Sequence, residues 1–417
     1  MDTNPKRIVV VGAGFAGLWS ALGAARKLDE LRIPPDQVEV VVINGTPYHS
    51  IRVRNYEQPL DPTLVPLDDV LDPAGVRRIQ GVVRVIDLRK REVEIDAGAQ
   101  TLRLDYARLI LAAGSELARP DIPGLREFAF DIDTFQSADR LHEHLLQLPH
   151  REDSAGCLTV VVVGAGLTGI ELASELPARL RGIVDANERD SIHVILADRS
   201  AKIGQAMGGA QPVIEEALRA QGIELLPGVS LEAVTRDGIE LTGGKRIDAA
   251  TVVWCGGMRA NPLTAQFPAQ SSVTLDAFGR VPVDTFLRVD KVPAAFAAGD
   301  CARILIDGER PSVMSCQHGR PMGRYAGHNA VCDLLGQEML PLRIDWYTTI
   351  LDLGPWGAVY TDGWERRLAS QGENAKQTKR TINCERIYPP RNGEREDILQ
   401  AAAPVVQAPP HTVREAP

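Results

Sequence analysis

Two stretches of this chain share one pattern, and that pattern decides the fold. Residues 7–22 read RIVVVGAGFAGLWSAL, and residues 159–176 read TVVVVGAGLTGIELASEL. Each stretch has a short β-branched run, then G-x-G-x-x-G, then a helical pattern. A glycine-rich turn between a strand and a helix is the fingerprint of a dinucleotide-binding βαβ unit. The sequence therefore predicts two such units.

The three glycines of each loop have different tasks. The first allows a tight turn, the second lets the backbone approach a pyrophosphate, and the third lets the helix pack close to the strand. They are Gly12, Gly14 and Gly17 in the first copy and Gly164, Gly166 and Gly169 in the second. The helix N-terminus offers free N–H groups to phosphates. The alternative is a pair of glycine-rich turns without a ligand, but the context matches twice.

Each copy is followed by a second apolar strand, which ends at Asn44 in the first unit and at Asp198 in the second. An acidic residue at this place accepts the ribose hydroxyls of an adenosine. Asp198 disfavours the 2′-phosphate of NADPH by charge repulsion, although Arg199 softens that preference. We expect NADH in the second unit, with NADPH as the alternative. Asn44 is either a ribose ligand without charge or a turn residue before Gly45.

Both halves continue with short alternating segments and close on an apolar run, LILAAG ending at Gly114 and TVVWCGG ending at Gly257. The alternating segments predict two antiparallel meanders. The expected strands are 82–87, 93–95 and 101–104 in the first half and 223–226, 231–234 and 239–241 in the second.

A further segment follows the second unit. Residues 294–304, AAFAAGDCARI, predict a buried strand that ends in Gly299–Asp300. Asp300 is then a cofactor ligand or a helix N-cap. A helix is expected from about Pro321 to about Leu335, because proline is favoured in a first helical turn.

These motifs carry a family resemblance. The sequence resembles the flavoproteins with two dinucleotide-binding domains (the pyridine nucleotide-disulfide oxidoreductase superfamily), and within them the type II NADH dehydrogenase (NADH:quinone oxidoreductase) branch. The resemblance covers roughly residues 5–335. Besides the glycine loops, it rests on residues 44–57, 109–115, 252–263 and 296–302, which read NGTPYHSIRVRNYE, LILAAGS, VVWCGGMRANPL and FAAGDCA.

The resemblance implies that the first unit holds FAD and the second NADH. It also implies that Asp300 bonds the ribityl or pyrophosphate part of FAD, and that Glu171 lies by the nicotinamide. The expected fold class is α/β, with two Rossmann-like domains, the second inserted in the first, and a C-terminal α+β extension. We expect the FAD domain over 1–120 and 270–337, the NAD(P)H domain over 121–269, the extension over 338–390 and a mostly disordered tail over 391–417.

The acceptor segment departs from the family pattern. Type II NADH dehydrogenases carry A-Q-x-A-x-Q-x-G beside the flavin, and residues 312–319 here read SVMSCQHG. Gln317 and Gly319 match, whereas Val313 replaces the first glutamine. A helix that begins here would aim its positive N-terminus at the flavin pyrimidine. His318 either relays a proton to the reduced acceptor or is a turn residue at the helix start.

Composition and cysteines narrow the function. The chain has a formal net charge of −9 and 5% aromatic residues, which argues against nucleic acid as a partner. Six cysteines include no C-x-x-C pair and no zinc-ligand spacing, so we expect no redox-active disulfide, no metal and a reducing cytoplasm. No window approaches the 18 apolar residues of a membrane-spanning helix. At most, peripheral membrane contact is expected.

The C-terminal region is less informative. Residues 364–380 predict a solvated surface helix, because only Trp364 and Leu368 are large and apolar. Residues 347–364 predict a hairpin with aromatics that covers the flavin or forms the contact of a homodimer.

The expected function is that of an FAD-dependent NAD(P)H oxidoreductase that passes electrons to a quinone-like or other small acceptor. The alternatives are a reductase of a carrier protein of the ferredoxin or rubredoxin type, and a poorly turning-over FAD-binding accessory protein.

Overall fold

The first domain is built on a parallel sheet that gathers strands from both ends of the chain. The computed structural model describes residues 5–150 and 156–409. The sheet has the order β20-β9-β1-β2-β5. Its strands are β1 (Lys6–Val11), β2 (Val38–Asn44), β5 (Arg77–Gln80), β9 (Arg108–Leu111) and β20 (Ala295–Ala297). The continuous apolar runs of β1, β2 and β9 are almost fully buried, as in parallel sheets covered on both faces.

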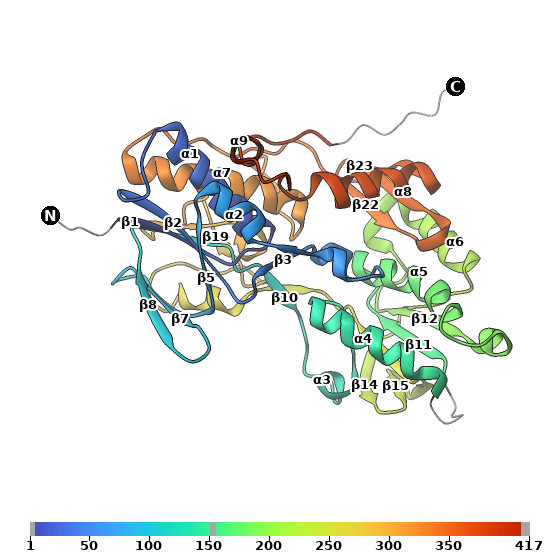
Figure 1. The fold of residues 1–417 in the computed structure, drawn as a ribbon. Coiled ribbons are helices and arrows are strands. Elements are labelled where there is room, and N and C mark those ends of the chain that lie inside the picture. The colour runs from blue at the N-terminus through green and yellow to red at the C-terminus, as the bar shows by residue number, and fades with distance from the viewer. Residues whose placement is uncertain (1–4, 151–155, 410–417) are drawn as a thin grey trace, which may run out of the picture.

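Two helices pack closely against each other beside this sheet (Figure 1). They are α1 (Phe15–Glu30) and α7 (Cys316–Leu335). A Cβ added at Gly327 would lie 2.0 Å from the Ser20 carbonyl oxygen, so the glycine permits the close approach. The shorter α2 (Asp68–Ala74) and β3 (Tyr48–Ser50), which pairs with β4 (Leu64–Pro66), complete this part.

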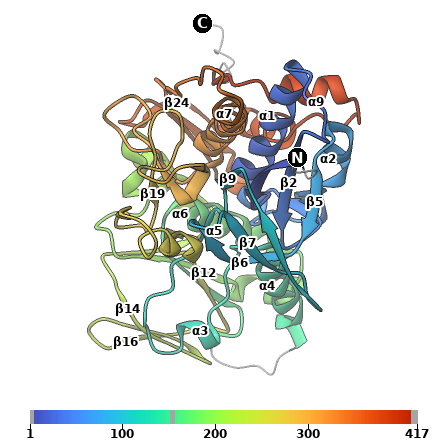
Figure 2. The same ribbon diagram turned by 90° about the vertical axis from the view of Figure 1, so that its left-hand side faces the viewer.

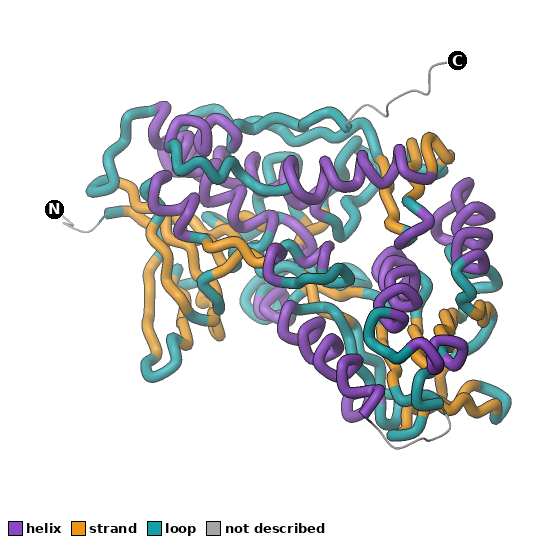
Figure 3. Tube along the Cα trace, turned by 45° about the vertical axis from the view of Figure 1, so that its right-hand side comes forward, coloured by secondary structure: helices purple, strands orange, loops and turns teal. Residues whose placement is uncertain are grey.

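The second domain repeats the arrangement. Its parallel sheet has the order β13-β12-β11-β17. The strands are β11 (Thr159–Val163), β12 (His193–Asp198), β13 (Glu224–Pro227) and β17 (Thr251–Trp254), and the helices are α3 (Leu125–Phe128), α4 (Phe135–Gln147), α5 (Leu167–Arg181) and α6 (Gln211–Ala220). In Figure 3, helices (purple) lie above the strands (orange) of the first domain at the left of the view. The predicted α/β fold class is confirmed.

The second domain is inserted in the first. The chain crosses between them at β10 (Ser115–Leu117) and returns at β18 (Met258–Ala260), and these two strands pair antiparallel. After the return, β20 adds to the first sheet beside β9. The predicted buried strand is therefore confirmed, although it ends at Ala297 and Gly299–Cys301 form a short 3-10 turn. Two short strands, β19 (Val281–Pro282) and β21 (Ala302–Arg303), pair next to it.

The meanders are partly as predicted. In the first half, β6 (Val82–Asp87), β7 (Glu92–Asp96) and β8 (Thr101–Asp105) form the expected sheet. In the second half, β14 (Leu231–Thr235) and β15 (Gly238–Leu241) are joined by β16 (Lys245–Asp248). The prediction of a meander strand at 223–226 was wrong, because this apolar run is β13 at the edge of the parallel sheet. The charged β16 offered no hydrophobic pattern to recognise.

The helix α7 begins earlier than predicted. It starts at Cys316 instead of near Pro321, because the Ser315 side chain accepts the His318 N–H and caps the helix. Pro321 lies inside the helix, which ends at Leu335 as expected. Figure 2 shows α1, α7 and α9 at one end of the molecule and β14 and β16 at the other.

The part of the chain that follows α7, here called the extension, contains a small antiparallel sheet and a helix. Its elements are β22 (Thr348–Asp352), β23 (Ala358–Asp362), β24 (Arg367–Gln371) and α8 (Gly372–Arg380). The hairpin of β22 and β23 confirms that prediction. The prediction of one solvated helix over 364–380 was wrong, because its first part is β24 and α8 buries Ala375, Thr378 and Lys379.

The terminal segment was predicted to be disordered, and this was wrong for residues 391–409. The helix α9 (Arg395–Ala401) buries Ile398 and Leu399 against α1 and α2. This stretch mixes charged and polar residues with apolar ones; Ile398, Leu399 and Ala402 are buried, whereas Val405 is exposed. Residues 410–417 lie outside the described part of the chain.

The contact between α1 and α7 yields a test. Alanine is favoured over glycine in a helix interior by about 1 kcal/mol, so propensity alone predicts that Gly327→Ala stabilises the protein. The overlap with the Ser20 carbonyl reverses this sign, and we expect a loss of roughly 1–3 kcal/mol, measured as a lower thermal unfolding midpoint. In the control Gly182→Ala, the nearest atom would be 3.4 Å away, and the midpoint should hardly change. An unchanged or higher midpoint for Gly327→Ala would contradict the described packing.

Candidate functional site

One cavity connects the two glycine loops. Its volume is about 1660 Å³, and its lining runs from residues 12–16 at one end to residues 164–168 at the other. Pockets for single small ligands usually have roughly 300–1000 Å³. The cavity therefore offers room for two extended ligands in contact.

The first loop is shaped as a pyrophosphate cradle. Gly12 has a φ of +95°, and a Cβ there would lie 2.5 Å from the Ala112 carbonyl oxygen. At Gly17, a Cβ would lie 1.9 Å from the Gly12 carbonyl oxygen, so the helix packs tightly on the turn. Gly14 has no atom within 4 Å of its Cβ position and faces open space. The first turn of α1 has no capping side chain and no acidic residue, so its N–H groups are available to an anion.

The second loop has the same geometry. Gly164 has a φ of +110°, and a Cβ added there would lie 2.8 Å from the Cys255 carbonyl. A Cβ added at Gly169 would lie 1.8 Å from the Gly164 carbonyl oxygen. Gly166 faces open space, and α5 also begins without a capping side chain. The residues present therefore fit the pyrophosphates of two dinucleotides.

The last residues of β2 and β12, Asn44 and Asp198, hold the first and the second glycine loop in the same way. Asn44 Oδ1 accepts the Ala13 N–H at 3.0 Å, and Asp198 Oδ2 accepts the Ala165 N–H at 2.7 Å. Both side chains line the cavity. Burial raises the pKa of Asp198, but the N–H groups of Ala165 and Ser200 outweigh it and leave the pKa below its ordinary value. Asp198 is thus charged at neutral pH. Asn44 does more than make a turn, since it fixes the loop.

Asp300 lies beside the first loop. It follows β20, sits inside the short 3-10 turn Gly299–Cys301, and accepts a hydrogen bond from Ser115 Oγ at 2.6 Å. Burial raises its pKa, whereas the Ser115 hydroxyl lowers it. Asp300 lines the cavity and is not the N-cap of the turn, which is Ala298. Gly114 and Gly257 also line the cavity, with φ values of +71° and +97° and no atom near their Cβ positions.

Glu171 is placed differently from the loop residues. It is buried in α5, outside the residues that line the cavity. Its carboxylate forms an ion pair with Lys379 of α8 and accepts the Asp352 N–H at 3.1 Å. Burial raises the pKa of Glu171, and Lys379 lowers it, with a net shift upward. No sequence motif marks Lys379, which lies in a segment that was expected to be solvated.

The acceptor segment contributes only part of its residues to the cavity. Met314, Ser315, Cys316 and Gly319 line it, whereas Gln317 and His318 do not belong to the lining. His318 is fully buried, and its Nδ1 accepts the Val313 N–H at 2.9 Å. Burial lowers the pKa of His318 to about 4.

The His318 ring lies beside the stacked rings of Tyr347 and Trp364 from the extension. This environment favours a structural role for His318 over the proton relay. The Gln317 side-chain amide nitrogen is buried and has no hydrogen-bond partner among the described residues.

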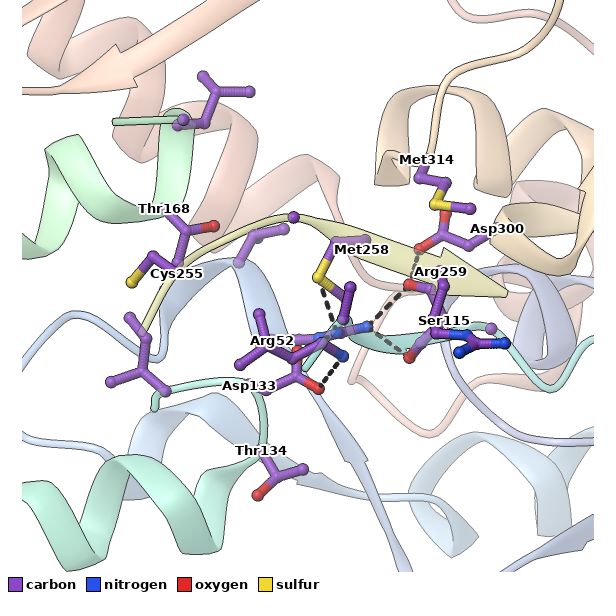
Figure 4. Close-up of a pocket in the computed structure, with 18 of the residues that line it drawn as sticks. Arg52, Ser115, Asp133, Thr134, Thr168, Cys255, Met258, Arg259, Asp300 and Met314 are labelled. Atoms are coloured by element: carbon purple, nitrogen blue, oxygen red, sulfur yellow. Dashed lines mark hydrogen bonds and ion pairs between the residues drawn. The ribbon is translucent and has the colours of Figure 1, made fainter. Parts of the chain in front are cut away.

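Sequence reasoning missed four residues in the middle of the cavity. Figure 4 shows them together: Arg52, Ser115, Asp133 and Met258. Arg52 forms an ion pair with Asp133. The available signal was an arginine inside the Tyr-His segment that follows β2, but its partner lies 81 residues further on.

The structure also bears on the cysteines, on metal binding and on membrane-spanning helices. Cys255 and Cys316 line the cavity from different domains, and all six cysteines are free. Burial raises the pKa of the Cys255 thiol to about 12. Among the described residues, no group of three or more His, Cys, Asp or Glu side chains is placed to hold a metal ion. In the same part of the chain, no helix combines the length and apolarity that crossing a membrane requires.

Fold and cavity together define a protein of the class with two Rossmann-like, dinucleotide-binding domains, one inserted in the other. The chain belongs to the pyridine nucleotide-disulphide oxidoreductase family, whose model matches residues 6–323.

Comparison with similar proteins indicates which branch of this family the chain resembles. The chain is 54% identical to an NADH dehydrogenase-like protein of Mycobacterium tuberculosis, over 97% of this chain and 100% of that protein. It is 25% identical to the type II NADH:quinone oxidoreductase of Staphylococcus saprophyticus, over 93% and 96% of the two chains. The solved structure of NDH2 from Plasmodium falciparum superimposes with a TM-score of 0.77 at 13% identity, over 96% and 98%. The resemblance inferred from the motifs is confirmed.

The buried pair of Glu171 and Lys379 yields a prediction on stability and pH. Lys379→Met leaves a carboxylate buried without its cation, which should cost roughly 3–5 kcal/mol at neutral pH. The pKa of Glu171 then rises further above 4.5, because the effect of Lys379 that lowers it is lost. A raised folded-state pKa means that the folded protein binds more protons. The stabilisation that comes from protonated Glu171 is therefore complete below the pKa that Glu171 has in the unfolded chain. It is lost as the pH rises through the pKa that Glu171 has in the folded protein.

Thermal unfolding of Lys379→Met across pH measures this effect. The midpoint should fall with rising pH, and Glu171→Gln in the same chain should remove the slope. Arg380→Met is the matched control, because it breaks only an exposed pair with Glu373, worth about 0–1 kcal/mol. A Lys379→Met profile equal to that of the unmodified protein would rule out the pair.

Proposed function

We propose that the protein is an FAD-dependent NADH oxidoreductase that delivers electrons to a small, quinone-like acceptor. FAD is assigned to the Gly12 loop and NADH to the Gly164 loop. When bound, FAD would accept a hydride from NADH and release the electrons to the acceptor. The observation that carries the proposal is the single cavity with a pyrophosphate cradle at each end.

The chain's own residues bind and orient both nucleotides in this proposal. Gly14 and Gly166 leave space for the pyrophosphates, and the free N–H groups of α1 and α5 donate to them. Asp300 is suited to accept a hydroxyl of the FAD ribityl chain. Asp198 keeps its charge and accepts ribose hydroxyls, which favours NADH over NADPH.

The acceptor is assigned to the neighbourhood of the α7 N-terminus. Met314, Ser315 and Cys316 bring this segment to the cavity. The unpaired amide of Gln317 supports a polar contact with an acceptor carbonyl after a small side-chain movement. Quinone appears in the name of the Staphylococcus saprophyticus relative, and we carry it over as the acceptor class.

Electron transfer in this proposal uses no redox-active disulfide. The Cys255 thiol, with its pKa raised to about 12, is a poor nucleophile at neutral pH. Six free cysteines suit a reducing cytoplasm, where the enzyme meets its acceptor in solution or at the membrane surface.

The proposed function is tested by the flavin spectrum under anaerobic conditions. The purified protein should carry FAD, and NADH should bleach its visible absorbance without oxygen. Added quinones should then restore the colour with turnover above about 1 s⁻¹, an ordinary enzyme value. Absence of FAD, or a flavin that NADH does not reduce, would refute the proposal. Faster reoxidation by ferredoxin or rubredoxin than by any quinone would replace the acceptor class with a carrier protein.

Asp198 gives a test of the nucleotide preference. Asp198→Asn removes the charge that repels a 2′-phosphate. Its amide oxygen can still accept the Ala165 N–H, whereas the hydrogen bond from the Ser200 N–H is lost. The ratio of kcat/KM for NADPH to that for NADH should rise about tenfold, which corresponds to about 1.4 kcal/mol. Asp237→Asn is the control, because this exposed aspartate of the same domain lies outside the cavity lining. A ratio that stays constant in Asp198→Asn would show that Asp198 does not contact the ribose.

A further inference from the structure

A guanidinium group ties the two domains together in the middle of the cavity. Arg52 Nη1 donates to the Ser115 carbonyl oxygen at 3.1 Å and to Ser115 Oγ at 3.2 Å. Its Nη2 forms the ion pair with Asp133 and lies 3.6 Å from Met258 Sδ. Arg52 belongs to the first domain, Ser115 and Met258 to the two crossing strands β10 and β18, and Asp133 to the segment before α4 (Figure 4). The Arg52 guanidinium group is therefore held in place by contacts from both domains and from the strands that connect them.

The Arg52 guanidinium lines the cavity together with its ion-pair partner Asp133. The side chain lines the cavity and is 31% exposed. An arginine has five N–H donors, and the Nε–H of Arg52 has no hydrogen-bond partner among the described residues, since all of its bonds are made by Nη1 and Nη2. The guanidinium is thus fixed in place and still has a donor to offer to a ligand.

Arg52 is also coupled to the residue that we assign to FAD. Ser115 Oγ accepts from Arg52 and donates to Asp300 Oδ2 at 2.6 Å. A chain of three polar side chains therefore runs from the first glycine loop to the middle of the cavity. Figure 4 shows Arg52 between Thr168, at the start of α5, and Asp300, beside the first loop. Two ligands that enter from the two loops would therefore meet at this place.

We infer that Arg52 sets the reduction potential of the bound flavin by presenting a fixed positive charge where the flavin and nicotinamide rings meet. This inference rests on the proposed function. Hydride transfer moves two electrons and one proton, so one net negative charge passes from NADH, which becomes NAD⁺, to the flavin. A cation that the protein holds in a fixed position stabilises such a charge without reorganising. Arg52 thereby favours the reduced flavin.

The test measures the reduction potential of the FAD-bound, full-length protein. Arg52→Met keeps the length of the side chain and removes its charge, whereas Arg52→Lys keeps the charge. At a fixed ratio of a reduced to an oxidised reference dye, the ratio of reduced to oxidised flavin should fall about tenfold in Arg52→Met, or about 30 mV for a two-electron couple. In Arg52→Lys the fall should be less than about threefold.

Two further variants separate charge from structure. Arg54→Met is the matched control, because Arg54 lies two residues away, pairs with Glu57 and does not line the cavity; its potential should equal that of the unmodified protein. Asp133→Asn removes the negative partner and leaves the cation, so the ratio of reduced to oxidised flavin should rise. Loss of structure alone does not predict opposite shifts for Arg52→Met and Asp133→Asn.

An unchanged potential in FAD-bound Arg52→Met, or shifts of the same sign in Arg52→Met and Asp133→Asn, would overturn the inference. If Arg52→Met does not retain FAD, Asp133→Asn decides, and an unchanged or lowered potential overturns the inference. The proposed function fails separately, when the unmodified protein binds no FAD or when NADH does not reduce it.

Discussion

Two tight turns, each pressed against the end of a neighbouring strand, are the constraint on which the cavity depends. Gly12 and Gly164 have positive φ values, and a Cβ at either position would lie within 3 Å of the backbone of Ala112 or Cys255. Only glycine fits there without displacing the closing strand. This contact directs the N-termini of α1 and α5 toward the same space, where Gly14 and Gly166 leave room for a ligand.

The remaining parts of the site follow from the path of the chain. Because the second domain is inserted, β20 and α7 return to the first domain and bring Asp300 and the acceptor segment to the cavity. The extension then reaches the second domain through the ion pair of Lys379 with Glu171. The crossing strands β10 and β18 hold Ser115 and Met258 around Arg52 between these parts.

Local patterns in the sequence predicted the repeated elements well and the long-range contacts poorly. The glycine loops, the strands around them and the position of Asp300 follow from short motifs whose meaning is local. The pairs Glu171–Lys379 and Arg52–Asp133 join residues 208 and 81 positions apart, and no periodicity encodes them. Composition also gave wrong predictions near the C-terminus, where a solvated helix and a disordered tail were expected. The helices α8 and α9 pack through a small number of buried side chains in otherwise polar stretches. The early start of α7 depended on one capping serine.

The assignment of one nucleotide to each loop is the central claim, and selective obstruction tests it most directly. Valine at Gly14 or Gly166 would fill the open space over one loop only. The measurement is the FAD content of each variant together with its dissociation constant for NADH. Gly14→Val should be purified without FAD, whereas Gly166→Val should keep its flavin spectrum and bind NADH at least about tenfold more weakly, a loss of about 1.4 kcal/mol. Loss of FAD from Gly166→Val, with FAD retained in Gly14→Val, would contradict the account.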